Sequence, residues 1–256
     1  MNGHRLAGGV LLAAAAAGAA AALGSAGAAG ATCASISGVG TGNGCTSTPT
    51  SFAIGIGAGT TADSKGIFSG AFAVGTNASA QNTGNFDLAA ALGDGASVSN
   101  TGDFNLGVAA GKNAFTVNSG TANVGFALGE RAATSNSGVG NLAVAVGNPG
   151  NNPGLDIDGT TKVSPNTSQA TVAQTNGVFN RAFAIGNGTV AAAIGGDPAN
   201  PLTKIGNNTA LALGNGSGSY AGQIPVLPLA GANTPNNQFA AALGNLQNAV
   251  NGINNK

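Results

Sequence analysis

Residues 94–111 read DGASVSNTGDFNLGVAAG, and residues 112–129 read KNAFTVNSGTANVGFALG. Both stretches carry alanine at their third position, asparagine at their seventh and twelfth, and glycine at their ninth and last. The pattern continues on both sides, so that glycines recur every eighteen residues at Gly57, Gly75, Gly93, Gly111, Gly129 and Gly147. A short fixed period predicts one supersecondary unit stacked on copies of itself.

Each repeat ends in a segment of alternating residue size. In the repeat that ends at Gly111, Leu106 and Val108 alternate with Gly107 and Ala109. A period of two predicts a β-strand with bulky side chains on one face and small ones on the other. We expect the bulky columns to bury apolar area inside the stack. The small column would then be an external flat face suited to self-association, formed by Ala89, Ala109, Ala127, Ala145 and Ala184.

The eighteen residues also divide into three sixes, as in LGDGAS, VSNTGD and FNLGVA from Leu92 onward. This division resembles the hexapeptide repeat of left-handed parallel β-helices, which implies three short sides per coil. A flatter β-roll with two sheets is the alternative. In either case the expected fold is all-β, a parallel β-solenoid with 18 residues per coil.

One polar column runs through the regular repeats. It consists of Asn82, Asn100, Asn118 and Asn136. Because equivalent residues of stacked coils lie about 4.8 Å apart, their side-chain amides are expected to bond to one another as a ladder.

The prolines divide the chain into regular coils and insertions. All nine prolines fall outside the regular copies, and proline cannot donate to a sheet ladder. We therefore expect a solenoid over residues 51–244 with inserted loops at 148–168, 196–206 and 216–238. In residues 245–256, apolar side chains recur at helical spacing. They predict a short C-terminal helix that caps the last coil, with a loose tail as the alternative.

The N-terminus has the layout of an export signal. A positive charge at Arg5 is followed by an uncharged, Ala-rich run and then by small residues, the order typical of a signal peptide. We expect residues 1–31 to be removed, with an uncleaved membrane anchor as the alternative. Residues 32–50 would then form the first segment of a secreted or cell-surface protein. In that setting Cys33 and Cys45, the only cysteines, are expected to form a disulfide.

Composition limits the chemistry available. Charged residues make up 6% of the chain, with eight basic and eight acidic side chains, so no basic patch suggests nucleic-acid binding. The only histidine, His4, lies in the predicted signal peptide. We therefore expect no catalytic, metal-binding or cofactor-binding residues in the mature chain.

Two resemblances bear on function. The tetrapeptides FAIG at 52–55, FAVG at 72–75 and FALG at 126–129 are similar to the head repeats of trimeric autotransporter adhesins, which are stacked β-rolls that bind host or matrix surfaces. The hexapeptide NTGNFD at 82–87 resembles the Asn/Gly repeats of exported mycobacterial PPE-type proteins. The Ala- and Gly-rich composition is also typical of an actinobacterial exported protein.

The expected function is that of an exported, non-catalytic structural, surface or adhesin-like protein of a bacterial envelope. Its partners would be an envelope glycan, a host or matrix surface, or further copies of itself. One alternative is a secreted carbohydrate-active β-helix enzyme that uses Asp156 and Asp158. Another is an ice-binding-like protein that uses a hydroxyl column formed by Thr83, Thr101, Ser119 and Ser137.

Overall fold

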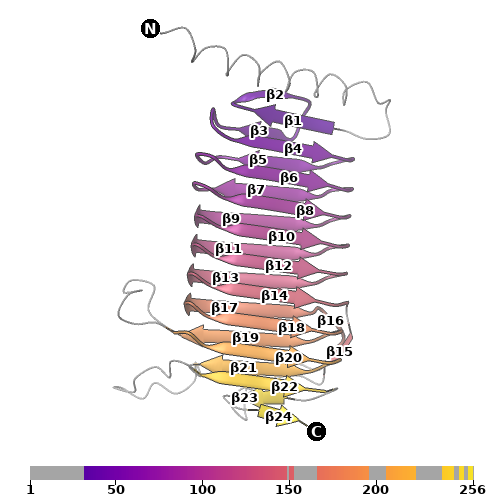
Figure 1. Ribbon diagram of the computed structural model, residues 1–256. Helices are drawn as coiled ribbons and strands as arrows, with labels where there is room; N and C mark the ends of the chain where they lie inside the picture. Colours follow the sequence, from indigo (N-terminus) through magenta and orange to yellow (C-terminus); the bar gives the residue numbers. More distant parts are fainter. Residues whose placement is uncertain are drawn as a thin grey trace.

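The chain forms a stack of β-coils in a computed structural model, which describes residues 32–148, 150–152, 166–195, 206–222, 238–244, 248–250 and 253–255 (Figure 1). Every regular element within these residues is a strand, and none is a helix. The predicted signal peptide, residues 1–31, lies outside the described part. The fold of the described residues is the parallel β-solenoid that the repeat predicts.

Two large sheets run along the stack. The twelve-stranded sheet contains, in spatial order, β2 (Val39–Thr41), β1 (Thr32–Ile36), β4 (Phe52–Ile56), β6 (Gly70–Val74), β8 (Leu88–Leu92), β10 (Leu106–Ala110), β12 (Val124–Leu128), β14 (Leu142–Val146), β18 (Arg181–Ile185), β20 (Thr209–Leu213), β22 (Phe239–Leu243) and β24 (Ile253–Asn255). The ten-stranded sheet contains β23 (Asn248–Val250), β21 (Gly218–Gly222), β19 (Val190–Gly195), β17 (Val172–Val178), β13 (Ala133–Val139), β11 (Phe115–Thr121), β9 (Ser97–Asp103), β7 (Ser79–Thr83), β5 (Thr61–Ser64) and β3 (Cys45–Ser47).

Each regular coil therefore has two strands, not the three that the division into sixes predicts. The chain passes from β10 in one sheet to β11 in the other and returns as β12, which pairs with β10 in parallel and in register, Val108 opposite Phe126. Both corners are tight because each holds two residues with positive φ, Gly111 and Asn113 in one and Gly120 and Ala122 in the other. These reversals leave no segment for a third side, so the cross-section is the flatter two-sheet alternative.

The interior of the stack is built from small residues. Ala89, Ala109 and Ala127 are fully buried, whereas Leu128 is 37% exposed. The expectation of buried bulky columns and an external alanine face is therefore wrong. The alanines point into the core, and the bulky side chains point outward. The reason is the narrow space between the sheets. A Cβ added at Gly107 would lie 2.5 Å from Cγ1 of Val98 on the facing sheet, so larger side chains must point outward.

The asparagine column lies inside this narrow core as a continuous ladder. The Nδ2 atom of Asn100 donates to Oδ1 of Asn82 at 2.9 Å, and Asn118 donates to Asn100 at 2.8 Å. Asn136 donates to Asn118 at 2.7 Å. The same Nδ2 atoms reach across the coil to backbone carbonyls of the twelve-stranded sheet, such as Leu88 O at 2.8 Å from Asn100. The ladder thus satisfies the buried amides and links neighbouring coils as well as the two sheets.

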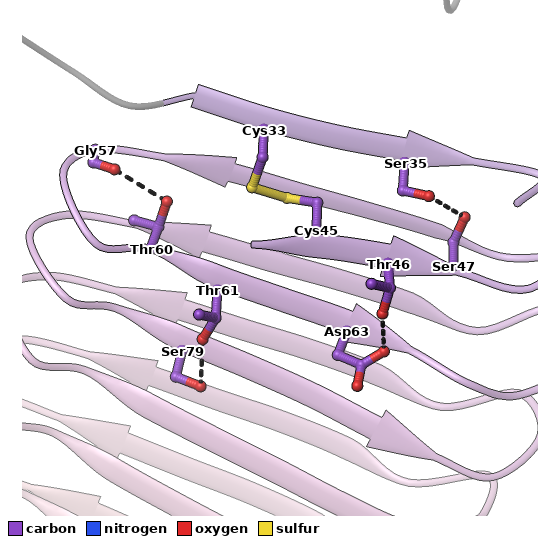
Figure 2. Close-up of a disulfide and its surroundings, with 10 residues drawn as sticks. All are labelled: Cys33, Ser35, Cys45, Thr46, Ser47, Gly57, Thr60, Thr61, Asp63 and Ser79. Carbon is purple, nitrogen blue, oxygen red and sulfur yellow. Dashed lines mark hydrogen bonds between the residues drawn. A yellow bond between two sulfur atoms is a disulfide. The ribbon is translucent and has the colours of Figure 1, made fainter. Parts of the chain in front are cut away.

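The N-terminal end is closed by an antiparallel hairpin. Strand β1 pairs antiparallel with β2 on one side and with β4 on the other. Cys33 on β1 and Cys45 on β3 form the expected disulfide, with a Cα–Cα distance of 5.4 Å (Figure 2). It joins the two sheets inside the core. Gly55 leaves the space for it, because a Cβ at this position would lie 2.7 Å from Sγ of Cys33.

The insertions and the C-terminal end differ in part from expectation. Between β14 and β17 the chain leaves the stack, and β15 (Gly150–Asn152) pairs antiparallel with β16 (Asn166–Gln169). The segment 216–238 is not wholly an insertion, since it includes β21 of the ten-stranded sheet. The predicted C-terminal helix is wrong. β23 and β24 instead extend the two sheets by pairing in parallel with β21 and β22.

Candidate interaction surface

The outer surface of the twelve-stranded sheet is almost entirely apolar. Eight parallel strands, β4 to β20 in that sheet, each present three outward residues in register. The central column is Ile54, Phe72, Ala90, Val108, Phe126, Val144, Phe183 and Leu211. The flanking columns are Phe52, Gly70, Leu88, Leu106, Val124, Leu142, Arg181 and Thr209, and Ile56, Val74, Leu92, Ala110, Leu128, Val146, Ile185 and Leu213. We call this surface the apolar face.

The apolar face is accessible along its length. Ile56 is 40% exposed at one end and Ile185 is 41% exposed near the other, with Leu88 and Leu92 also exposed between them. Large contiguous apolar surfaces are unusual on monomeric soluble proteins and mark interaction sites. The apolar face is therefore the strongest candidate for a functional surface among the described residues.

The opposite surface of the solenoid has a different chemistry. From β5 to β17, the outward residues of the ten-stranded sheet are mainly hydroxyl and amide side chains, although Phe115, Val117, Ala133 and Val172 interrupt them. The next strand, β19, places the apolar residues Val190, Ala192 and Ile194 at the equivalent positions. The polar members are Thr61, Asp63, Ser79, Gln81, Thr83, Ser97, Ser99, Thr101, Ser119, Ser135, Ser137, Gln174 and Asn176. We call this surface the hydroxyl face. It includes the single hydroxyl column noted in the sequence, and the solenoid is thus amphipathic across its two sheets.

One corner of the coils borders the apolar face with charges of both signs. Asp94, Lys112 and Glu130 follow Gly93, Gly111 and Gly129 in successive coils, and all three are exposed. Oδ1 of Asp94 accepts a hydrogen bond of 2.8 Å from the backbone N–H of Thr76. This bond is the main reason that the pKa of Asp94 is lowered, and Lys112 lowers it further. Arg131, next to Glu130, is also exposed, so this rim carries two charges of each sign.

The other corner carries a stack of exposed phenylalanines. Phe68, Phe86 and Phe104 all have positive φ, at 55°, 59° and 60°. The ring centroids of Phe86 and Phe104 are 5.0 Å apart with an interplanar angle of 1°, and those of Phe68 and Phe86 are 5.5 Å apart. Phe86 lies between the other two rings, so both of its faces are covered and only its edge faces solvent. Phe86 therefore offers no free aromatic face on which a sugar ring could stack.

Beside this corner lies a second buried polar column, which contains one carboxyl group. Oδ1 of Asn105 accepts from the backbone N–H of Asn123 at 3.0 Å, and its Nδ2 donates to Gly120 O at 3.0 Å. In the preceding coil the position is Asp87, which is 1% exposed. Its Oδ1 accepts from the N–H of Asn105 at 2.7 Å, but its buried Oδ2 has no hydrogen-bond partner. Burial is the main cause that raises the pKa of Asp87 to about 6.

The glycines, asparagines and cysteines that the sequence singles out are not members of the apolar face. Gly75, Gly93, Gly111, Gly129 and Gly147 occupy one corner of each coil with positive φ. Asn82, Asn100, Asn118 and Asn136 lie in the interior, and the disulfide lies at the N-terminal end. Asp156 and Asp158 lie outside the described residues. In the part of the chain that the structure describes, no group of three or more His, Cys, Asp or Glu side chains is placed to hold a metal ion.

Comparisons with known proteins identify no family for the chain. No protein-family model, curated protein or solved structure matches the chain. Among the described residues, no helix has the length and apolarity needed to cross a bilayer. The class defined by the geometry is a parallel β-solenoid with one apolar and one hydroxyl-rich sheet.

Proposed function

We propose that the chain is an exported, non-catalytic structural or adhesin-like protein of a bacterial envelope, which acts through its two sheet surfaces. The observation that carries this proposal is the contrast between the apolar face and the hydroxyl face on one repeated scaffold. The repeat places the same side-chain chemistry at each coil, which suits extended contact with a surface.

Two further observations support an extracytoplasmic location. The Cys33–Cys45 disulfide is of a kind that persists in oxidising compartments, and the N-terminus has the order of a signal peptide. The likeness of the FAVG-type tetrapeptides to adhesin head repeats agrees with an exposed β-roll. The hydroxyl face and the inserted loops are the surfaces that would meet an envelope glycan or a host matrix.

The test is location and surface access in intact cells. The full chain carrying a C-terminal epitope tag would be followed by fractionation, by N-terminal sequencing and by labelling with a membrane-impermeant amine reagent. Lys65 and Lys112 are exposed and would react in intact cells to the same extent as in lysed cells. A matched variant, Lys65→Arg with Lys112→Arg, would reduce this labelling without changing the charge. A protein that stays in the cytoplasm with its first residues intact and is labelled only after lysis would overturn the proposal.

A second arm tests the adhesive role. The purified protein would be applied to immobilised envelope polysaccharide and to immobilised matrix proteins, with Ser99→Lys and Ser135→Lys as variants on the hydroxyl face. We expect binding that both variants weaken. An absence of binding to every surface would limit the role to a structural one.

A further inference from the structure

The apolar face spans eight strands and is nearly uncharged, so a partner surface that covers it must also be long and nearly uncharged. We propose that this partner is the same face of a second copy of this chain, packed sheet against sheet around a two-fold axis. The inference adds a partner to the proposed function. It rests on that proposal only for the cellular location in which the dimer acts.

The first support is area. Eight strands spaced about 4.8 Å apart, each five residues long, give a face of about 38 Å by 17 Å, or roughly 650 Å² on each copy. Two such faces bury roughly 1,300 Å², which lies within the range of stable, specific protein interfaces. The occupant thus needs no surface beyond the apolar face itself.

The second support is shape. All eight strands are in register, so large side chains form straight columns that repeat at the strand spacing. A second copy has the same spacing, and its columns match along the full length of the face. Face-to-face packing of sheets at about 10 Å is an established arrangement in β-sandwiches. A two-fold axis places the central column, which contains Val108, Phe126 and Val144, against its own counterpart.

The third support is charge. Arg181 is the only charged residue among the outward positions of these eight strands. Its Nη1 donates to Oδ1 of Asn207 at 3.1 Å, which holds the guanidinium at the margin of the face rather than at its centre. An anionic membrane surface attracts a rim of basic residues, whereas Asp94 and Glu130 balance the charges of Lys112 and Arg131 on this rim. A neutral, self-matching face favours a second copy over an anionic bilayer.

The experiment measures the molar mass of the purified protein by sedimentation equilibrium over a range of micromolar concentrations. We expect the mass to rise with concentration and to reach a plateau at that of two protomers. Phe126→Lys places a charge at the centre of the apolar face and should weaken dimerisation about 100-fold or more. Ser135→Lys is the control, because it introduces the same lysine at the central outward position of β13 on the hydroxyl face, and it should leave the dimer intact. Thermal unfolding of each variant establishes that it is folded.

A milder variant keeps the test decisive if Phe126→Lys does not fold. Val108→Ser with Val144→Ser removes apolar area from the central column without adding charge, and it should also weaken the dimer. A monomeric wild-type protein, a mass of three protomers, a mass that grows without a plateau, or equal effects of Phe126→Lys and Ser135→Lys would overturn the two-fold dimer. A monomer found on the cell surface would overturn the dimer alone, and a dimer found in the cytoplasm would overturn the proposed function alone.

Discussion

At the scale of single residues, Asp87 stands where the following coils place asparagine. Those asparagines use Nδ2 to donate to the carbonyl fifteen residues ahead, as Asn105 does to Gly120 O and Asn123 does to Gly138 O at 2.9 Å. The same offset places Gly102 O opposite Asp87. An ionised carboxylate has no proton to donate there, and its Oδ2 is buried without a partner. A neutral carboxylic acid has the required donor, in agreement with the raised pKa.

Asp87→Asn is therefore expected to stabilise the fold at neutral pH and to remove part of its pH dependence. The pKa of Asp87 is about 6 in the folded chain, against an ordinary value of 3.8, so the folded state binds the proton more tightly. Stability is then highest below the ordinary pKa and falls as the pH rises from about 4 through 6. The variant should gain on the order of 1–3 kcal/mol in unfolding free energy at pH 7.5 and little at pH 4.

Urea unfolding of both proteins at pH 4 and pH 7.5 measures this difference. Asp103 is the charged neighbour that adds to the raised pKa, so Asp103→Asn should reduce the pH dependence slightly. Asp94→Asn serves as the control, because Asp94 is exposed and its pKa is lowered instead. Identical pH profiles for wild type and Asp87→Asn would contradict the interpretation.

At the scale of elements, the sequence predicts the eighteen-residue period and the strands, but not which face of each strand points inward. The glycines at eighteen-residue spacing and the alternation around Val108 correctly predict parallel strands in register. They do not reveal which face of the strand is inside, because a period of two is the same in either direction. The narrow gap between Gly107 and Val98 decides which face points inward. These two residues lie on different sheets, so the sequence alone does not show that they are close.

The number of sides was hidden for a related reason. Eighteen residues can form three sides of six, or two strands of five and seven residues joined by two corners, and only the backbone distinguishes these arrangements. Phe104 occupies a positive-φ corner position that bulky residues seldom adopt, so its sequence looks like part of a strand. Sequence reasoning does not identify the apolar face, because it assigns these side chains to the core.

Gly111→Ala is the sharpest test of the two-corner coil. Gly111 has φ of 137°, and a Cβ there would lie 2.2 Å from the carbonyl oxygen of Gly129 in the next coil. Both the backbone conformation and the contact must change, so we expect a loss of more than about 3 kcal/mol in unfolding free energy. Lys112→Ala, at the next and exposed position, should change stability by less than about 0.5 kcal/mol. Denaturant unfolding compares the two, and equal midpoints would count against this corner geometry.

At the scale of the whole molecule, each coil contacts its neighbours in the stack, so stability is distributed along the axis. An exposed strand edge at either end of the stack is a site of fraying or of pairing with other chains. At the N-terminal end the antiparallel β1–β2 hairpin pairs with the edge of β4, the first parallel strand of the twelve-stranded sheet. The disulfide then ties that sheet to β3, the first strand of the ten-stranded sheet.

Removal of the disulfide should therefore loosen one end of the stack and leave the rest intact. The bridge joins residues twelve positions apart, and closing a loop of that size stabilises the chain by about 3 kcal/mol in the entropy model. In a Cys33→Ser, Cys45→Ser variant, hydrogen exchange should accelerate in β1, β3 and β4, while β12 and β13 keep their protection because their neighbours are unchanged. Ser35→Ala, which removes only the 2.8 Å hydrogen bond between Ser35 and Ser47, is the control for a smaller change at the same place. Uniform acceleration along all coils would mean that the solenoid unfolds as one cooperative unit.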